Sequence, residues 1–230
     1  STSTLRNLTT RQVGAIETID LVAMTTAQLL ALSSSQLQAL STAQVVELTS
    51  EQLAGLNSAA VNTLTTNQLS ALSSSKLNFL DMASVVGLTG TQLASLTTTQ
   101  TSGLSTATVA ALNTNAVISL TTAQIVALTT DQAANLTSTT VQALTTKQIA
   151  ALETTDLEVL TSSNIAILSS VQLQALTTSQ IAGLSSQQVL DLNTTSLQAL
   201  TTRQIAALET TDLVVMSTAQ LLALSSSQIQ

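Results

Sequence analysis

The chain contains no cysteine, proline, histidine, tryptophan or tyrosine, and Phe79 is its one aromatic residue. Without cysteine, disulfides and thiolate metal sites are excluded. Without histidine, the most common general base and the usual nucleophilic triad are missing. Yet 44% of the residues are apolar, so the chain should bury a core. Because no rings are available to fill a thick core, we expect thin layers of aliphatic side chains, as in a solenoid.

Charged residues are also scarce, and acids outnumber bases. Five lysines and arginines stand against twelve acids, a formal net charge of −7. Nucleic-acid binding needs clustered bases that displace counterions from phosphates, so no nucleic-acid partner is expected. Polar residues interrupt every apolar stretch long before it could cross a bilayer, so no membrane span is expected either.

A large apolar residue stands at every eighth position from Leu8 to Leu224, without one insertion or deletion. We call each eight-residue unit an octad and number its places 0 to 7 from this residue. Place 5 is Val, Leu or Ile in 26 of 28 octads, with Thr101 and Ala133 as exceptions. Place 7 is mostly small, which predicts close backbone approach. We predict one continuous octapeptide-repeat domain over residues 1–230 that begins and ends inside a repeat.

Places 1 and 4 together predict a helix start in each octad. Place 1 is Ser, Thr, Asn or Asp in 25 of 28 octads, and place 4 is most often Gln. Such a pair forms a capping box, in which each side chain bonds the backbone N–H of the other residue. The apolar residues at places 0 and 5 then form a hydrophobic staple. The clearest predicted caps are Thr121 with Gln124, Thr145 with Gln148, and Thr201 with Gln204.

The resulting fold prediction is an all-α solenoid of very short capped helices, one per octad. One uninterrupted helix would rotate its apolar places by about 80° per octad, so no face would stay buried. A β-solenoid is the alternative, because Thr, Val and Ile favour strands. In a straight strand, however, places 0 and 5 would point to opposite faces. Helices this short are unstable alone, so they should stack on neighbouring octads.

Three octads carry Glu at place 1 and Asp at place 4, and a base precedes each Glu by six residues. We interpret these groups as exposed ion pairs between octads, together with acids that are favoured near helix N-termini. A recurring calcium site is the alternative, but two carboxylates fall short of the six or more oxygen ligands that calcium takes. No metal ligand is therefore predicted. The predicted pairs are Arg11 with Glu17, Lys147 with Glu153, and Arg203 with Glu209.

Two resemblances bear on function. The octad motif of LTTAQIVAL, Leu120 to Leu128, resembles the opening of the transcription-activator-like effector repeat. The base-reading loop of that repeat is missing, so DNA recognition does not carry over. Over its whole length the chain resembles the tandem short-repeat regions of giant secreted, adhesin-like bacterial proteins. That resemblance implies an extracellular or cell-surface location and a structural role.

We therefore expect a structural protein, an extracellular stalk or a self-assembling filament subunit of a bacterial surface or biofilm. Its expected partners are copies of itself, and no catalytic residue or cofactor is predicted. The alternative is a binding module, in which the Thr/Ser-rich face of the solenoid binds a glycan, ice or a protein.

Overall fold

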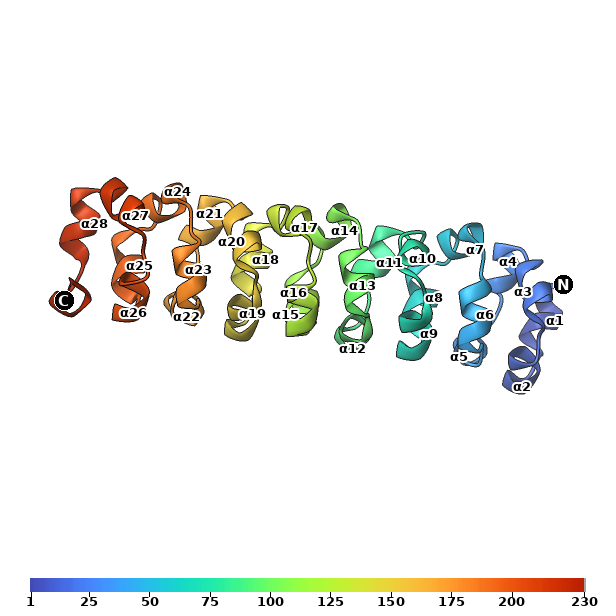
Figure 1. The fold of residues 1–230 in the computed structure, drawn as a ribbon. Coiled ribbons are helices and arrows are strands. Elements are labelled where there is room, and N and C mark those ends of the chain that lie inside the picture. The colour runs from blue at the N-terminus through green and yellow to red at the C-terminus, as the bar shows by residue number, and fades with distance from the viewer. Residues whose placement is uncertain (230) are drawn as a thin grey trace. The chain divides into compact units, whose positions relative to one another are not determined.

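The computed structural model describes residues 1–229, which form 29 short α-helices and no strand (Figure 1). The all-α prediction is confirmed, and the β-solenoid alternative is wrong. The chain divides into two compact units, residues 1–111 and 112–230, and each is described by itself. That one domain runs through all 230 residues stays a prediction.

The first unit contains fourteen helices, each four to six residues long. They are α1 (Thr2–Arg6), α2 (Thr10–Gly14), α3 (Thr18–Val22), α4 (Thr26–Leu29), α5 (Ser34–Gln38), α6 (Thr42–Glu47), α7 (Ser50–Ala54), α8 (Ser58–Thr63), α9 (Thr66–Ala71), α10 (Ser74–Leu77), α11 (Met82–Val86), α12 (Gly90–Ser95), α13 (Thr98–Ser102) and α14 (Thr106–Ala110).

The second unit contains the other fifteen helices of the described chain, with the same range of lengths. They are α15 (Thr114–Ser119), α16 (Thr122–Val126), α17 (Thr130–Ala134), α18 (Ser138–Ala143), α19 (Thr146–Ala151), α20 (Thr154–Val159), α21 (Ser162–Ala166), α22 (Ser170–Ala175), α23 (Thr178–Ala182), α24 (Ser186–Leu190), α25 (Thr194–Ala199), α26 (Thr202–Ile205), α27 (Thr210–Val215), α28 (Thr218–Ala223) and α29 (Ser226–Ile229).

Where a helix runs to place 7, the corner that follows it is made by two extended residues, as after α15. Leu120 at place 0 has φ −62° and ψ 136°, and Thr121 at place 1 has φ −72° and ψ 158°. The next helix then begins at place 2. Within residues 1–229 no residue has positive φ and no peptide bond is cis. These corners therefore need neither glycine nor proline, which explains how a chain so poor in both can change direction in every octad.

Within each unit, three octads make one turn. The helices that pack most closely on one another are three apart along the chain, as α4 is from α7 and α19 from α22. Figure 1 shows such helices stacked side by side along each unit. Equivalent places in successive turns are therefore three octads apart in the sequence.

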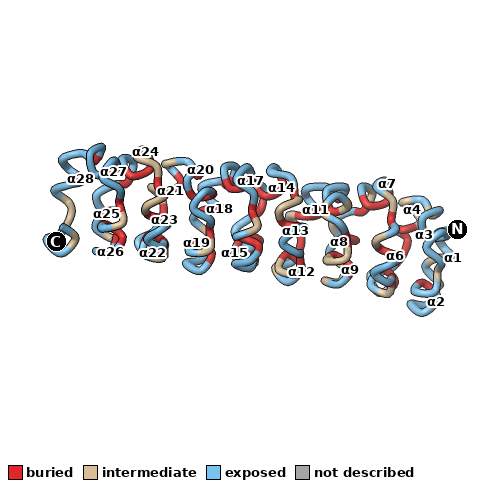
Figure 2. Tube along the Cα trace, viewed as in Figure 1, coloured by how far each residue is buried: buried red, intermediate tan, exposed pale blue. Residues whose placement is uncertain are grey.

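Places 0 and 5 supply the core. From Val13 to Ile205 every place 5 residue is at most 6% exposed, and place 0 residues from Leu32 to Met216 are at most 8% exposed. Figure 2 shows these buried positions (red) alternating with exposed ones along the tube. At two glycines of place 7 the preceding turn lies very close: a Cβ on Gly55 would clash with the side chain of Thr26, and one on Gly103 with that of Ser74. The close approach predicted for place 7 is seen at these two positions.

Replacing Ile149 by alanine tests this core. Ile149 is completely buried in α19, so the substitution should lower the free energy of unfolding by about 2–5 kcal/mol. Unfolding in urea is followed by circular dichroism at 222 nm, because the chain has no tryptophan or tyrosine for fluorescence. The control is Val171→Ala, at a side chain that is 64% exposed, where a change within about 0.5 kcal/mol is expected. Equal effects at both positions would contradict the assigned core.

Candidate functional site

The predicted helix caps form as follows. The side chain of Thr121 accepts a hydrogen bond from the N–H of Gln124 at 3.2 Å, and the N–H of Thr121 donates to Oε1 of Gln124 at 2.8 Å. The same reciprocal bonds join Thr145 to Gln148, and Thr201 to Gln204. Each box satisfies free N–H groups at the start of a helix and fixes the residue at which that helix begins.

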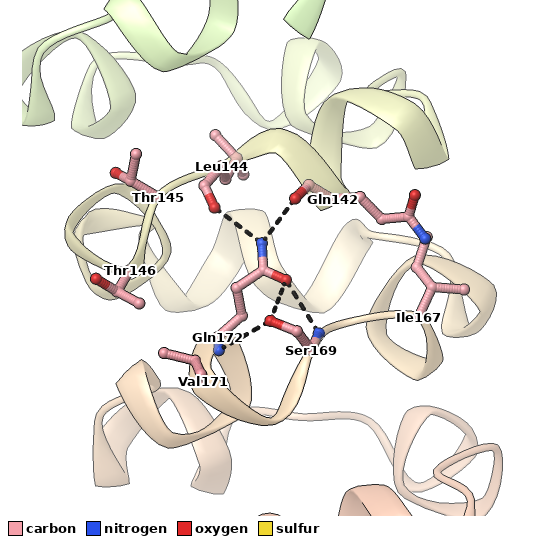
Figure 3. A pocket seen from close by; sticks show the side chains of 8 residues that line it. All are labelled: Gln142, Leu144, Thr145, Thr146, Ile167, Ser169, Val171 and Gln172. Carbon is pink, nitrogen blue, oxygen red and sulfur yellow. Dashed lines mark hydrogen bonds between the residues drawn. The ribbon is translucent and has the colours of Figure 1, made fainter.

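The glutamine at place 4 has a second role that the sequence analysis did not identify. Its Nε2 group points away from its own helix and donates to backbone carbonyls of the preceding turn. Gln172 is an example, seen in Figure 3: Nε2 donates to Leu144 O at 2.8 Å and Gln142 O at 3.1 Å, while Oε1 accepts from Ser169. One side chain thus begins its own helix and joins it to the turn before.

We call these cross-turn bonds the amide ladder. In each of them Nε2 donates to the place 0 carbonyl 28 residues earlier at 2.6–2.8 Å, and nearly all also donate to the place 5 carbonyl 31 residues earlier. The place 5 carbonyl also accepts a backbone bond from the next place 0 N–H, as Ile149 O does from Leu152 at 3.3 Å. In the described residues the place 0 carbonyl has no such backbone donor, so the ladder bond satisfies a group that would otherwise be unpaired. The ladder glutamines are Gln36, Gln44, Gln52, Gln68, Gln92, Gln100, Gln148, Gln172, Gln180, Gln188, Gln204, Gln220 and Gln228.

One signal in the sequence pointed to this role. Glutamate serves a capping box as well as glutamine does, and the helix dipole favours it in the first turn. Nevertheless, place 4 is Gln in 17 of 28 octads and never Glu. Of the two side chains only the amide carries hydrogen-bond donors, so the preference for glutamine over glutamate indicates that place 4 commonly donates as well as accepts.

Two octads satisfy the same carbonyls with other donors. Nζ of Lys76 in α10 donates to Leu48 O at 2.9 Å, 28 residues earlier, and also to Val46 O. Nδ2 of Asn164 in α21 donates to Leu136 O at 3.0 Å, again 28 residues earlier. The register of the ladder therefore holds even where glutamine is replaced.

The acidic octads correct one prediction. Their place 4 acids were expected at the surface, but Asp156 is 1% exposed and Asp212 is 3% exposed. The physical reason is that place 4 faces the preceding turn, which covers Asp156 and Asp212; Asp20, in the first turn of the described chain, is exposed. Burial raises the pKa of Asp156 most strongly, while a hydrogen bond from Thr130 opposes the rise and the charge of Glu153 adds to it.

The charged groups of the predicted ion pairs all lie at the surface. No ion pair within 4.0 Å joins a base to an acid in residues 1–229. Glu17 and Glu153 occupy N-cap positions without a side-chain cap bond. Even a formed ion pair at such exposed positions would contribute only about 0–1 kcal/mol to stability. None of these groups takes part in the amide ladder. The exposed side chains are Arg11, Glu17, Lys147, Glu153, Arg203 and Glu209.

An open groove recurs at one kind of corner. In the second unit it has a volume of about 440 Å³ and lies between the corner that follows α18 and the corner before α22 (Figure 3). The exposed side chain of Val171 and the hydroxyls of Thr145 and Thr146 border it. The first unit has a groove of about 370 Å³ at the same places of the octads, fifteen octads earlier. Both volumes are within the range of small-molecule sites.

Within residues 1–229, no helix has the length and apolar character needed to span a lipid bilayer. In the same residues no three acidic side chains gather as a metal site would require.

Comparison with known proteins places the octads in a family. The model of the ALTTAQ repeat matches residues 13–50, 106–138, 149–186 and 205–230, which is more than half of the chain. No curated protein matches the chain. The motif ALTTAQ corresponds to places 7, 0, 1, 2, 3 and 4, so it covers the small residue of close approach, the staple, the cap and the ladder glutamine. The chain is a tandem repeat protein and belongs to the ALTTAQ repeat family.

Proposed function

We propose that this chain is a structural array protein, a stalk segment or self-assembling filament subunit on the outside of a bacterial cell. The observation that carries the proposal is the amide ladder, which joins successive turns in the same register in both units. Every turn directs amide donors toward the preceding turn and carbonyl acceptors toward the following one. The two faces of a turn are therefore different and complementary.

The two ends of the described chain display these two faces. In the first three complete octads the place 5 residues are completely buried, whereas the place 0 residues are partly exposed. In the last turn the place 5 residues Leu213, Leu221 and Ile229 are 39%, 43% and 66% exposed and border a hollow of about 550 Å³. These faces accept either a further turn of a longer array or a turn of a second copy.

Contact between two such faces is head to tail. Because the two surfaces differ, each added copy leaves a free face for the next, and the assembly grows as an open filament wherever the rotation between copies does not close a ring. Burial of each large aliphatic side chain contributes about 1.5–3 kcal/mol, so one covered face favours association. The ladder bonds would fix the register of the added copy.

Light scattering over a series of protein concentrations tests self-assembly. We expect the mean mass of the 230-residue chain to rise with concentration, and electron microscopy to show filaments. The control is the double variant Leu221→Glu and Ile229→Glu, which places charges on the last face and should remain monomeric with an unchanged circular dichroism spectrum. A wild-type chain that stays monomeric at high concentration contradicts the filament role.

The extracellular part of the proposal has separate support. It rests on the resemblance to tandem short-repeat regions of giant secreted, adhesin-like proteins. Protease treatment of intact cells that express the native protein tests it: a surface array is digested, whereas a protein inside the cell is protected.

A binding module is the second candidate, and the recurring groove favours it. The two grooves share most of their lining places and combine apolar side chains with hydroxyls and amides, although Glu51 in the first unit stands where the second has Val171. Such a surface is suited to a glycan. A glycan array tests this candidate with the wild-type chain and a Val171→Glu variant. Binding that the variant loses would favour a binding module over a purely structural array.

A further inference from the structure

One position of the ladder holds an acid that is buried without a full set of partners. Asp156 stands at place 4 of its octad, in α20, and is 1% exposed. The hydroxyl of Thr130, in the preceding turn, donates a hydrogen bond to its carboxyl group. The other oxygen, Oδ2, is buried and has no hydrogen-bond partner.

The next octad shows what this oxygen faces. Asn164 occupies the equivalent place, its Oδ1 accepts from Ser138 at 2.9 Å, and its Nδ2 donates to Leu136 O at 3.0 Å. The carbonyl 28 residues before Asp156 is that of Leu128, so by analogy with Asn164 the unpartnered Oδ2 is expected to face Leu128 O. At this place asparagine donates a hydrogen bond to the carbonyl through its N–H, whereas an ionised aspartate has only acceptor oxygens and cannot bond the carbonyl. Only the neutral acid has an O–H to donate.

The charged groups around Asp156 are all acidic. Asp131 lies on α17 and Glu158 on α20, Glu153 caps α20, and each of these side chains is exposed. The other helix packed on α20 is α23, which carries no titratable residue. No base on these elements faces the carboxyl group, so both burial and its charged neighbours favour the neutral form.

Asp212 is a natural comparison, because it lies in the same sequence context, ETTDL. It is also buried, but both of its oxygens have partners. Oδ1 accepts from the hydroxyl of Ser186 at 2.8 Å, and Oδ2 accepts from the N–H of Glu209 at 3.3 Å. Both oxygens of Asp212 therefore accept hydrogen bonds, whereas Oδ2 of Asp156 has no partner.

We propose that Asp156 is a pH-sensitive element of the amide ladder. When neutral, its Oδ2–H donates to Leu128 O and joins α20 to the preceding turn. When ionised, it leaves a buried charge opposite that carbonyl, and the turn around α17 and α20 loosens. The folded pKa lies above the unfolded value near 3.8, so this contribution to stability is complete below that value. It is lost as the pH rises through the folded pKa.

The experiment compares wild type with Asp156→Asn and Asp212→Asn in urea unfolding, from about pH 4 to about pH 8. Asparagine can donate at every pH. We therefore expect the midpoints of wild type and Asp156→Asn to coincide in acid, and the variant to gain the higher midpoint as the pH rises. Amide exchange within α17 and α20 should be at least about tenfold slower in this variant at neutral pH. Asp212→Asn should show no such pH-dependent gain.

Three results would overturn the proposal. One is a midpoint difference between wild type and Asp156→Asn that does not change with pH. Another is a pH-dependent gain of the same size in Asp212→Asn. The third is a rise of the wild-type midpoint on adding calcium or sodium ions at fixed pH, because a cation would then be the partner of Oδ2. If Asp156→Asn fails to fold, carbon NMR titration of the Asp156 carboxyl in the unmodified chain gives the protonation state directly.

Discussion

Replacing Gln180 by glutamate should unfold the turns around α23. Gln180 is 2% exposed, its Oε1 accepts from the N–H of Thr177 at 2.7 Å, and its Nε2 donates to Ile149 O and Leu152 O, both at 2.8 Å. A carboxylate keeps the capping bond but loses both donors, so Leu152 O loses its partner, Ile149 O keeps only its backbone bond from Leu152, and both carbonyls face a charge. We expect the free energy of unfolding to fall by at least about 3 kcal/mol.

This loss should depend on pH, because the introduced acid can donate only when it is neutral. The burial and the facing carbonyls disfavour the charged form, so the destabilisation should shrink as the pH falls. Urea unfolding followed by circular dichroism measures it. The matched control is Gln142→Glu, an exposed glutamine of the same unit whose side chain takes no part in the ladder. Similar losses for the two variants would show that the ladder contributes little.

Deleting half an octad should damage the solenoid more than deleting a whole one. Removal of residues 169–176, the length of one octad, keeps the eight-residue spacing. Each place of an octad then still packs on the equivalent place of the turn before. Removal of residues 169–172 shortens one turn by half an octad, so places 0 and 5 on its two sides no longer meet. Burial of at least two large aliphatic side chains is lost, each contributing about 1.5–3 kcal/mol.

Circular dichroism and urea unfolding of the two deletion variants distinguish these outcomes. The whole-octad deletion should keep the wild-type helix content per residue and a similar midpoint. The half-octad deletion should lower both, although it removes half as much chain. If both deletions are tolerated equally, the stacking of octads does not depend on register, and the ladder does not join the turns as described.

The local structure of this protein follows from its octads. A hydroxyl at place 1, an amide at place 4 and apolar residues at places 0 and 5 lie close together along the chain, so their interactions depend on short-range geometry alone. For this reason Thr121 and Gln124 could be assigned to a capping box, and one short helix to each octad. The small residues at place 7 likewise indicated close approach, which Gly55 and Thr26 show.

The partners across turns could not be assigned in this way. All octads are nearly alike, so the pattern is the same whether an octad stacks on the second, third or fourth one before it. The number per turn depends on the angle at each corner, which results from the packing of many side chains together. Only the tertiary structure decided that it is three.

Two properties depend on that number. It brings Nε2 of Gln180 to the carbonyl of Leu152, 28 residues away, and so gives a capping residue its second role. It also buries Asp156 against the preceding turn, whereas the local pattern had indicated an exposed acid. The sequence by itself determined where each helix begins and which apolar side chains have to be buried. The tertiary structure decided which octad packs on those side chains, because the number of octads per turn is a property of the whole turn and not of any single octad.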